Sequence, residues 1–260
     1  MVEELFKELS KLEQVEAIAL GGSRATNNCD EKSDYDVYLY VTSPIDEQVR
    51  KDILSKYCKY MEIGNHYWEY EDNCVLNNDI DIDILYRDLD DFCAGVKSVV
   101  EDGIPSNCYT TCMWHNLVTC KIIYDGSGRL AKAKERFLVP YPAKLKQAII
   151  DRQMNLLSDA MPAFADQIKK AVKRDDYVSI NHRVTEFLAS YFDLIFAINE
   201  LTHPGEKRLM ALCKRDCKVL PKNFEENLMS LFSHMYAQGD DKLQCLSDIE
   251  NIVSAVKELV

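Results

Sequence analysis

The sequence of 260 residues lacks both a basic excess and a long uninterrupted apolar run. Lys and Arg number 31 against 43 Asp and Glu, which gives a formal net charge of -12. Proteins that bind duplex DNA or RNA displace counterions with a basic face, so this charge argues against duplex nucleic acid as the main ligand. The longest apolar stretch, residues 184–201, is interrupted by Glu186, Asp193 and Glu200, which indicates a buried helix and no membrane span.

The N-terminus has no pattern of a secretory leader, because charged residues mix with the apolar ones from Met1 to Leu12. We therefore expect a cytoplasmic protein whose ten cysteines are reduced thiols. Cys108 with Cys112 and Cys213 with Cys217 have C-x-x-x-C spacing, but neither pair has the C-x-x-C knuckle typical of zinc sites. The cysteines are interpreted as small buried hydrophobes in preference to metal ligands.

The composition is that of an ordinary globular protein, with 47% apolar and 28% charged residues. Its acidity is uneven: residues 1–140 hold 26 acidic and 15 basic side chains, a net of -11, whereas residues 141–260 have a net of -1. Most acidic surface is simply solvated. A cation site is the alternative, and it requires several carboxylates that converge on one point.

Two kinds of periodicity divide the chain. In the first half, helices are expected at residues 2–13 and 46–59, and strands at 15–20, 37–41, around 66–70, 80–85 and 117–124. In the second half, helices are expected at residues 145–161, 163–174, 177–201, 206–213, 223–237 and 242–259. The predicted fold is α+β, with a catalytic domain of mixed sheet and flanking helices at residues 1–140 and an α-helical bundle at residues 141–260.

A glycine pair follows the first predicted strand, in the segment Leu20-Gly21-Gly22-Ser23-Arg24. Glycines let the backbone approach a ligand closely, and exposed N–H groups at a helix start favour phosphate. By itself such a pair more often marks only a turn.

Paired carboxylates follow on later strands. Asp34 and Asp36 are two residues apart at the start of a strand, so both side chains lie on one face and can hold magnesium. In the segment 79–85, isoleucines alternate with Asp81 and Asp83. A third carboxylate beside the first two would complete a two-metal site. Asp83 is preferred because it lies deeper in the apolar run, and Asp81 is the reserve.

These motifs follow one another in a fixed order: an apolar strand, Gly-Gly-Ser, an eleven-residue segment from Ser23 through Ser33, Asp-Tyr-Asp-Val and a later acidic strand. The ordered set resembles the DNA polymerase β-type nucleotidyltransferase superfamily. The resemblance covers about residues 15–86. A helical bundle after such a domain is similar to the bacterial nucleotidyltransferases that act on aminoglycoside and lincosamide antibiotics.

The resemblance implies a role for each motif. Gly21, Gly22 and Ser23 would bind the phosphates of ATP or another nucleoside triphosphate, with Arg24 as a charge partner. Two Mg²⁺ ions would be shared by the three carboxylates of Asp34, Asp36 and Asp83. The product would be a nucleoside monophosphate, AMP for preference, joined to a hydroxyl of a small molecule, with release of pyrophosphate.

The helical half offers less specific candidates. A cation there is expected to meet the triphosphate, and the choices are Lys207, which is preferred, Arg208, Lys173 and Arg174. For each of them, a solvated helix end is the favoured explanation. Glu186 is the candidate base that the resemblance suggests, although a charge paired inside a bundle fits too.

Asp175 and Asp176 can simply begin or precede a helix. His66, Trp68 and Tyr70 alternate in a strand-like segment and either line an acceptor pocket or pack in the core.

Two other functions stay open from the sequence. One is a protein AMP-transferase of the toxin–antitoxin type, although such proteins often take the helical partner from a separate chain. The other is a nucleotide-binding regulatory module without turnover, which the filling of all three carboxylate positions argues against.

Overall fold

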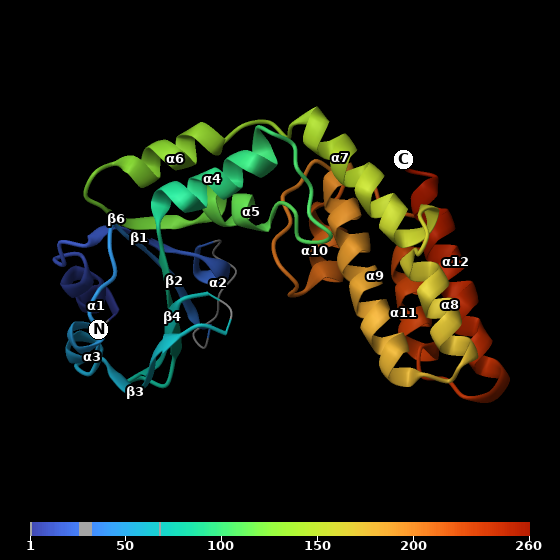
Figure 1. Cartoon of the computed structure of the whole chain (residues 1–260), viewed down its shortest axis with the longest axis horizontal. Helices are drawn as coiled ribbons and strands as arrows, with labels where there is room; N and C mark the ends of the chain where they lie inside the picture. The colour runs from blue at the N-terminus through green and yellow to red at the C-terminus, as the bar shows by residue number, and fades with distance from the viewer. Residues whose placement is uncertain (1, 26–32, 68) are drawn as a thin grey trace. The chain divides into compact units, whose positions relative to one another are not determined.

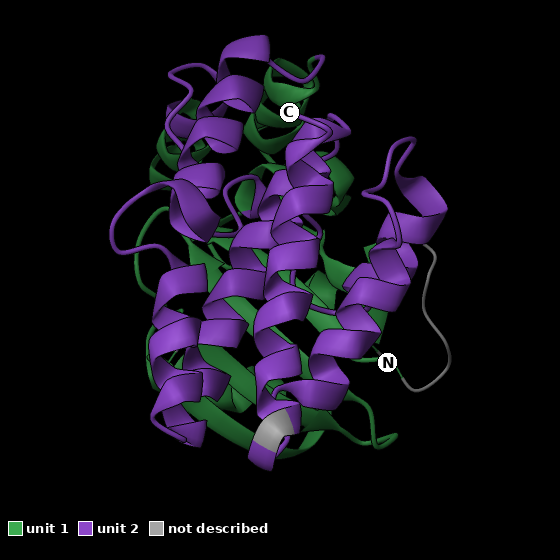
Figure 2. Ribbon diagram, turned by 90° about the vertical axis from the view of Figure 1, so that its right-hand side faces the viewer, with its two compact units in different colours: residues 1–97, 113–139 green, residues 98–112, 140–260 purple. Residues whose placement is uncertain are grey.

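A computed structural model describes residues 2–25, 33–67 and 69–260 and divides the chain into two compact units (Figure 2). Unit 1 comprises Met1–Lys97 and Met113–Val139, and unit 2 comprises Ser98–Cys112 and Pro140–Val260. The segment Ser98–Cys112 therefore packs with the helical unit, although the sequence analysis placed it in the first domain. Its buried Thr110 is bonded to the longest helix of unit 2, which accounts for the difference.

Unit 1 is built on a six-stranded sheet of order β3-β4-β5-β2-β1-β6 (Figure 1). Its strands are β1 (Val15–Leu20), β2 (Tyr35–Val41), β3 (Cys58–Asn65), β4 (Glu71–Leu76), β5 (Asp81–Arg87) and β6 (Lys121–Asp125). The pair β2 and β5 is parallel, and the other pairs are antiparallel. The predicted mixed sheet is confirmed.

The helices of unit 1 are α1 (Val2–Leu9), α2 (Gly22–Ala25), α3 (Glu47–Leu54), α4 (Leu89–Val100, whose last residues belong to unit 2), α5 (Cys112–Thr119) and α6 (Arg129–Phe137). One sheet face packs on α1 and α3 through an apolar core that includes Leu5, Leu54, Ile82 and Ile84. On the other face, Phe92 of α4 contacts Tyr40 of β2 edge to face. The period-two pattern of β5 thus buries isoleucines on one side and turns Asp81 and Asp83 to the other.

One predicted strand of unit 1 is wrong, and another is predicted to begin too early. The strand expected around residues 66–70 lies earlier, at Cys58–Asn65, where the exposed Lys59 and Glu62 hid the apolar alternation. Leu117 lies on α5, and only residues from Lys121 onward form the strand β6. Periodicity alone does not separate short apolar helices from strands.

Unit 2 is helical, as predicted. Its helices are α7 (Ala143–Met154), the π-helix η1 (Asn155–Asp159), α8 (Phe164–Lys173), α9 (Tyr177–Ile198), α10 (Leu209–Asp216), α11 (Phe224–His234), the 3₁₀ turn η2 (Gly239–Leu243) and α12 (Gln244–Lys257). Phe187, Tyr191 and Ile195 place α9 at the centre of the core. Among the described residues, no helix is both long and apolar enough for a membrane span.

A buried carboxylate fixes the crossing segment to this bundle. Asp193 of α9 accepts hydrogen bonds from the Thr110 backbone N–H at 3.0 Å, the Thr110 hydroxyl at 2.7 Å and Gln153 Nε2 at 2.8 Å. Burial raises the pKa of Asp193 to about 6, and these donors oppose the rise. The segment Ser98–Cys112 is thus attached to α9 through the Asp193 carboxylate, which has little contact with water.

Candidate active site

Two of the predicted carboxylates meet at the parallel pair of strands. Asp36 of β2 and Asp83 of β5 are direct partners in the register, so their Cα atoms lie on neighbouring strands, about 4.8 Å apart in such a sheet. Both side chains are half-buried and project from the same sheet face. Asp34 directly precedes β2, and Asp81 is exposed at the start of β5.

The glycine pair lies against these strands. The Gly21 N–H donates to the Asp36 carbonyl oxygen at 2.8 Å. Gly22 has a φ of +57°, and a Cβ added to it would be 1.9 Å from Oδ2 of Asp36. A residue with a side chain would therefore be strained and would displace the carboxylate, so glycine is required on both counts. A Cβ on Gly21 would likewise be 2.4 Å from the Tyr38 hydroxyl.

Arg24 has a different neighbourhood from the one expected. Its Nε donates to the carbonyl oxygens of Ser33 at 2.9 Å and Asp34 at 3.0 Å, and Nη2 also bonds Ser33. Its guanidinium lies over the Tyr35 ring, 3.8 Å from the centroid. Arg24 thus fixes the backbone that leads into the Asp34–Asp36 segment.

Asp83 has a neighbour on its other side that the sequence analysis did not find. Asn73 of β4 is its register partner, and Asn73 Nδ2 donates to Asp83 Oδ1 at 2.8 Å. Asn65 Nδ2 donates in turn to Asn73 Oδ1 at 2.6 Å. Glu71, two residues before Asn73, is buried, and its pKa is raised by burial and by the negative charge of Asp83. Only the register of the hairpin would have revealed these residues.

Arg87 supports the same face further along β5. Its guanidinium pairs in a fork with Glu69, with Nε–Oε2 at 2.8 Å and Nη2–Oε1 at 2.6 Å. It also stacks on Tyr38, 4.1 Å from the ring centroid. Because the Tyr38 ring lies against Gly21, the buried Arg87 guanidinium helps to hold this ring next to the glycine turn.

The donor set of the site suits magnesium. Within the described ranges, no group of three His, Cys, Asp or Glu side chains is placed to hold a metal ion by itself. Magnesium is commonly held by one or two carboxylates together with substrate phosphates, and it does not need an all-protein cage. Asp36 and Asp83 provide such a pair of hard oxygen ligands on one sheet face.

The candidates of the helical half lie in unit 2. Lys207 belongs to unit 2, in the turn before α10, whereas the predicted carboxylates belong to unit 1. Glu186 pairs with Arg183 at 2.7 Å on a partly exposed face of α9, so its charge is paired but does not lie inside the bundle. Asp176 caps α9 by accepting from the Ser179 N–H at 3.0 Å, as one interpretation of it predicted. Asp175 pairs with Lys242 at 2.7 Å.

The aromatic segment 66–70 contributes to another cluster. Tyr70 accepts a hydrogen bond from Arg50 Nη2 at 2.5 Å, and its ring stacks on His66 at 4.6 Å. Arg50 forms a fully buried ion pair with Asp72. Tyr70 is thus tied to this buried pair, while His66 is exposed. Trp68 lies outside the described residues.

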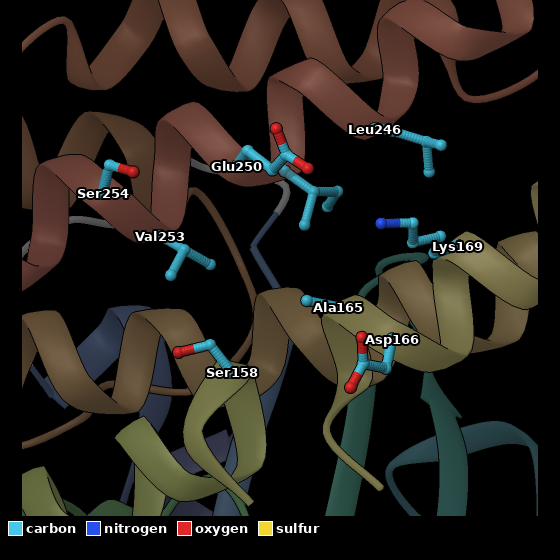
Figure 3. Close-up of a pocket in the computed structure, with 9 residues that line it drawn as sticks. Ser158, Ala165, Asp166, Lys169, Leu246, Glu250, Val253 and Ser254 are labelled. Carbon is cyan, nitrogen blue, oxygen red and sulfur yellow. The ribbon is translucent and has the colours of Figure 1, made fainter. Parts of the chain in front are cut away.

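Unit 2 has an open hollow of about 230 Å³ between α8 and α12 (Figure 3). Asp166 and Lys169 of α8 face Glu250 and Val253 of α12 across it. None of the predicted site residues lines this hollow.

The sequence of the first unit matches a family model described as "Nucleotidyltransferase domain" over residues 2–105. That range contains the glycine turn, both predicted acidic strands and the paired carboxylates. Residues 2–105 are a nucleotidyltransferase domain of the DNA polymerase β type. This domain has the nucleotidyltransferase type that the resemblance implied, and residues 109–209 match a second model, described as a domain of unknown function (DUF4037).

Solved structures similar to this nucleotidyltransferase are distant. A nucleotidyltransferase-like protein from Exiguobacterium sibiricum is 10% identical, with a TM-score of 0.45 over 98% of this chain and 75% of that chain. An aminoglycoside 6-adenyltransferase from Bacillus subtilis is 11% identical, with a TM-score of 0.31 over 100% and 89% of the two chains. The Thermotoga maritima CCA-adding enzyme is 10% identical, with a TM-score of 0.33 over 99% and 80%. No protein of curated function matches the sequence.

Proposed function

We propose that this nucleotidyltransferase transfers AMP from ATP to a hydroxyl of a cationic small molecule, such as an aminoglycoside, with magnesium as the cofactor. Lincosamides are the second acceptor class to be tested. The observation that supports this best is the register of β2 and β5, which puts Asp36 and Asp83 side by side next to the glycine turn.

In this proposal the glycine turn, the three carboxylates and Arg24 have different roles. The backbone of Gly22 and Ser23 would bind the triphosphate, because a glycine with positive φ allows close approach. Asp34, Asp36 and Asp83 would hold Mg²⁺, which when bound supplies charge stabilisation at the phosphates. Arg24 would keep the first two carboxylates in place through the carbonyl oxygens it binds.

Asp83 would also accept the proton of the acceptor hydroxyl. The hydroxyl oxygen would then attack the α phosphorus in line, its bond to phosphorus would form, and the bond to the pyrophosphate oxygen would break. The products are the nucleotidylated acceptor, pyrophosphate and one proton. Positioning and electrostatic stabilisation would supply most of the rate.

The acidic face around Asp83 favours a cationic acceptor. Glu71 of β4 and Asp81 of β5 lie on this sheet face, and Glu62 of β3 is the register partner of Asn73. Carboxylates at such spacing attract an acceptor that carries several ammonium groups.

The test measures pyrophosphate release with ATP, Mg²⁺ and a panel of aminoglycosides and lincosamides. Wild type is expected to release pyrophosphate with at least one acceptor, and Asp36→Asn and Asp83→Asn to abolish the release. Asp52→Asn is the matched control, because it changes the same residue type at an exposed position of α3, which packs on the opposite face of the sheet. Equal turnover in Asp36→Asn and wild type would refute the assignment of the carboxylates.

A further inference from the structure

Asp83 stands between two unlike neighbours in the sheet. On the β2 side its register partner is Asp36, a second carboxylate, and on the β4 side it is Asn73, a neutral amide. Two adjacent carboxylates repel each other unless a cation or a donor intervenes. The side chain of Asn73 is therefore the group that can restrain Asp83 before any ligand is bound.

The hydrogen bonds of Asn73 fix which way its amide points. A carboxylate only accepts, so the NH₂ group of Asn73 must face Asp83 Oδ1, at 2.8 Å. Its carbonyl oxygen then faces Asn65, whose NH₂ group donates to it at 2.6 Å and lies 3.3 Å from Glu62 Oε2. The carbonyl oxygen and an N–H group of this amide are thus both used.

The two oxygens of Asp83 consequently differ. Oδ1 is bonded to Asn73 on the β4 side. Within residues 2–25, 33–67 and 69–260, no hydrogen bond reaches Oδ2. Asp83 is half-buried, and Asn73 is held in turn by Asn65. The series of hydrogen bonds therefore runs from Asp83 through Asn73 to Asn65 on the edge strand β3.

We propose that Asn73, oriented by Asn65, is a positioning residue for Asp83: it holds Oδ1 and leaves Oδ2 presented on the Asp36 side for a divalent cation and the reacting hydroxyl. This inference rests on the proposed function. Groups that orient metal-ligating side chains typically contribute about 10–100-fold to metal affinity or activity. Asn73 would not touch the nucleotide, so the expected loss falls on the cation and on kcat.

The test compares Asn73→Leu and Asn73→Asp with wild type. Leu has nearly the same size without the donors, and Asp places a third negative charge beside Asp83 and Glu71. Asn77→Leu and Asn77→Asp are matched controls, since Asn77 is exposed in the turn after β4. Binding of Mn²⁺ in the presence of a non-hydrolysable ATP analogue is measured by electron paramagnetic resonance, and kcat and KM are measured by pyrophosphate release.

For Asn73→Leu we expect the Kd for Mn²⁺ to rise about tenfold and kcat to fall about tenfold, with KM for ATP within about twofold of wild type. The Asn73→Asp variant should be worse, and the Asn77 variants unchanged. Asn65→Leu should have a smaller effect than Asn73→Leu and no further effect in the Asn73→Leu background, because it acts through Asn73.

Three outcomes would overturn the proposal. The first is a folded Asn73→Leu protein, judged by its urea midpoint, that keeps the Kd for Mn²⁺ and kcat of wild type. The second is full additivity of the Asn65→Leu and Asn73→Leu effects. The third is wild type that binds no Mn²⁺ with the ATP analogue, which would also refute the proposed function. If wild type binds Mn²⁺ and ATP but modifies no acceptor, only the acceptor assignment fails, and the Mn²⁺ comparison still decides the role of Asn73.

Discussion

Replacement of Gly22 by alanine should damage the site far more than it damages the fold. The added Cβ would be 1.9 Å from Asp36 Oδ2, whereas ordinary contact begins at 3.4 Å, so the carboxylate must retreat by about 1.5 Å. A misplacement of about 1 Å near the reacting atoms can cost about 100-fold in rate, or about 2.7 kcal/mol in the barrier. Alanine at positive φ adds backbone strain of about 1–2 kcal/mol.

Gly128 provides the control that separates these two effects. Its φ is +70°, close to the +57° of Gly22, but a Cβ on Gly128 would meet nothing within 4 Å. Gly22→Ala and Gly128→Ala should therefore both lose about 1–2 kcal/mol of unfolding free energy in urea. Only Gly22→Ala should lose pyrophosphate release, by about 100-fold. Equal kcat in the two variants would show that position 22 does not need glycine to leave room for the Asp36 carboxylate.

Three further predictions concern buried charge and the loop before β2. The pKa of Asp193 is raised from 3.8 to about 6 in the folded chain, so the native state holds a proton that the unfolded chain releases, and the unfolding free energy should fall by about 3 kcal/mol as pH rises from about 4 to above 6. Urea titrations at each pH should show that this fall moves to higher pH in Thr110→Val. An unchanged curve in that variant would contradict the role of the Thr110 hydroxyl. Arg50→Met should cost about 3–5 kcal/mol of unfolding free energy in urea, because it leaves the buried Asp72 carboxylate without its countercharge, and the added change Asp72→Leu should recover part of the loss. Additive losses would count against the pair. Arg24→Gln should reduce kcat roughly tenfold with little change in the urea midpoint. Arg24→Lys should have a similarly low kcat, because lysine lacks the planar guanidinium that reaches two carbonyl oxygens. Full activity in the lysine variant would contradict this role of the guanidinium.

The sequence predicted most of what local patterns control. The motif order and the alternation of Ile82 and Ile84 with aspartates predicted a mixed sheet with an acidic face, and long apolar periods predicted the helices of the second half. Asp36 and Asp83 could be nominated as partners from their residue type and motif order, and the structure places them side by side.

What could not be predicted depends on strand register. Asn73 and Asn65 carry no motif, and their relation to Asp83 exists only through the pairing of β4 with β3 and β5. Arg24 was expected at a phosphate because its charge suggests an anion, whereas in the structure its Nε and Nη2 groups donate to carbonyl oxygens of its own loop. The strand at residues 58–65 was missed because its exposed edge is polar.

The parallel pairing of β2 with β5 also has a consequence for folding. Asp36 and Asp83 are far apart in the chain and become neighbours only after α3 and the β3–β4 hairpin have closed the crossover between their strands. A fragment that ends before β5 would contain the complete Gly-Gly-Ser and Asp-Tyr-Asp motifs and still lack the carboxylate pair. Metal-dependent nucleotide binding by this chain would therefore report that the long-range part of the sheet has formed, which circular dichroism of the isolated motifs could not reveal.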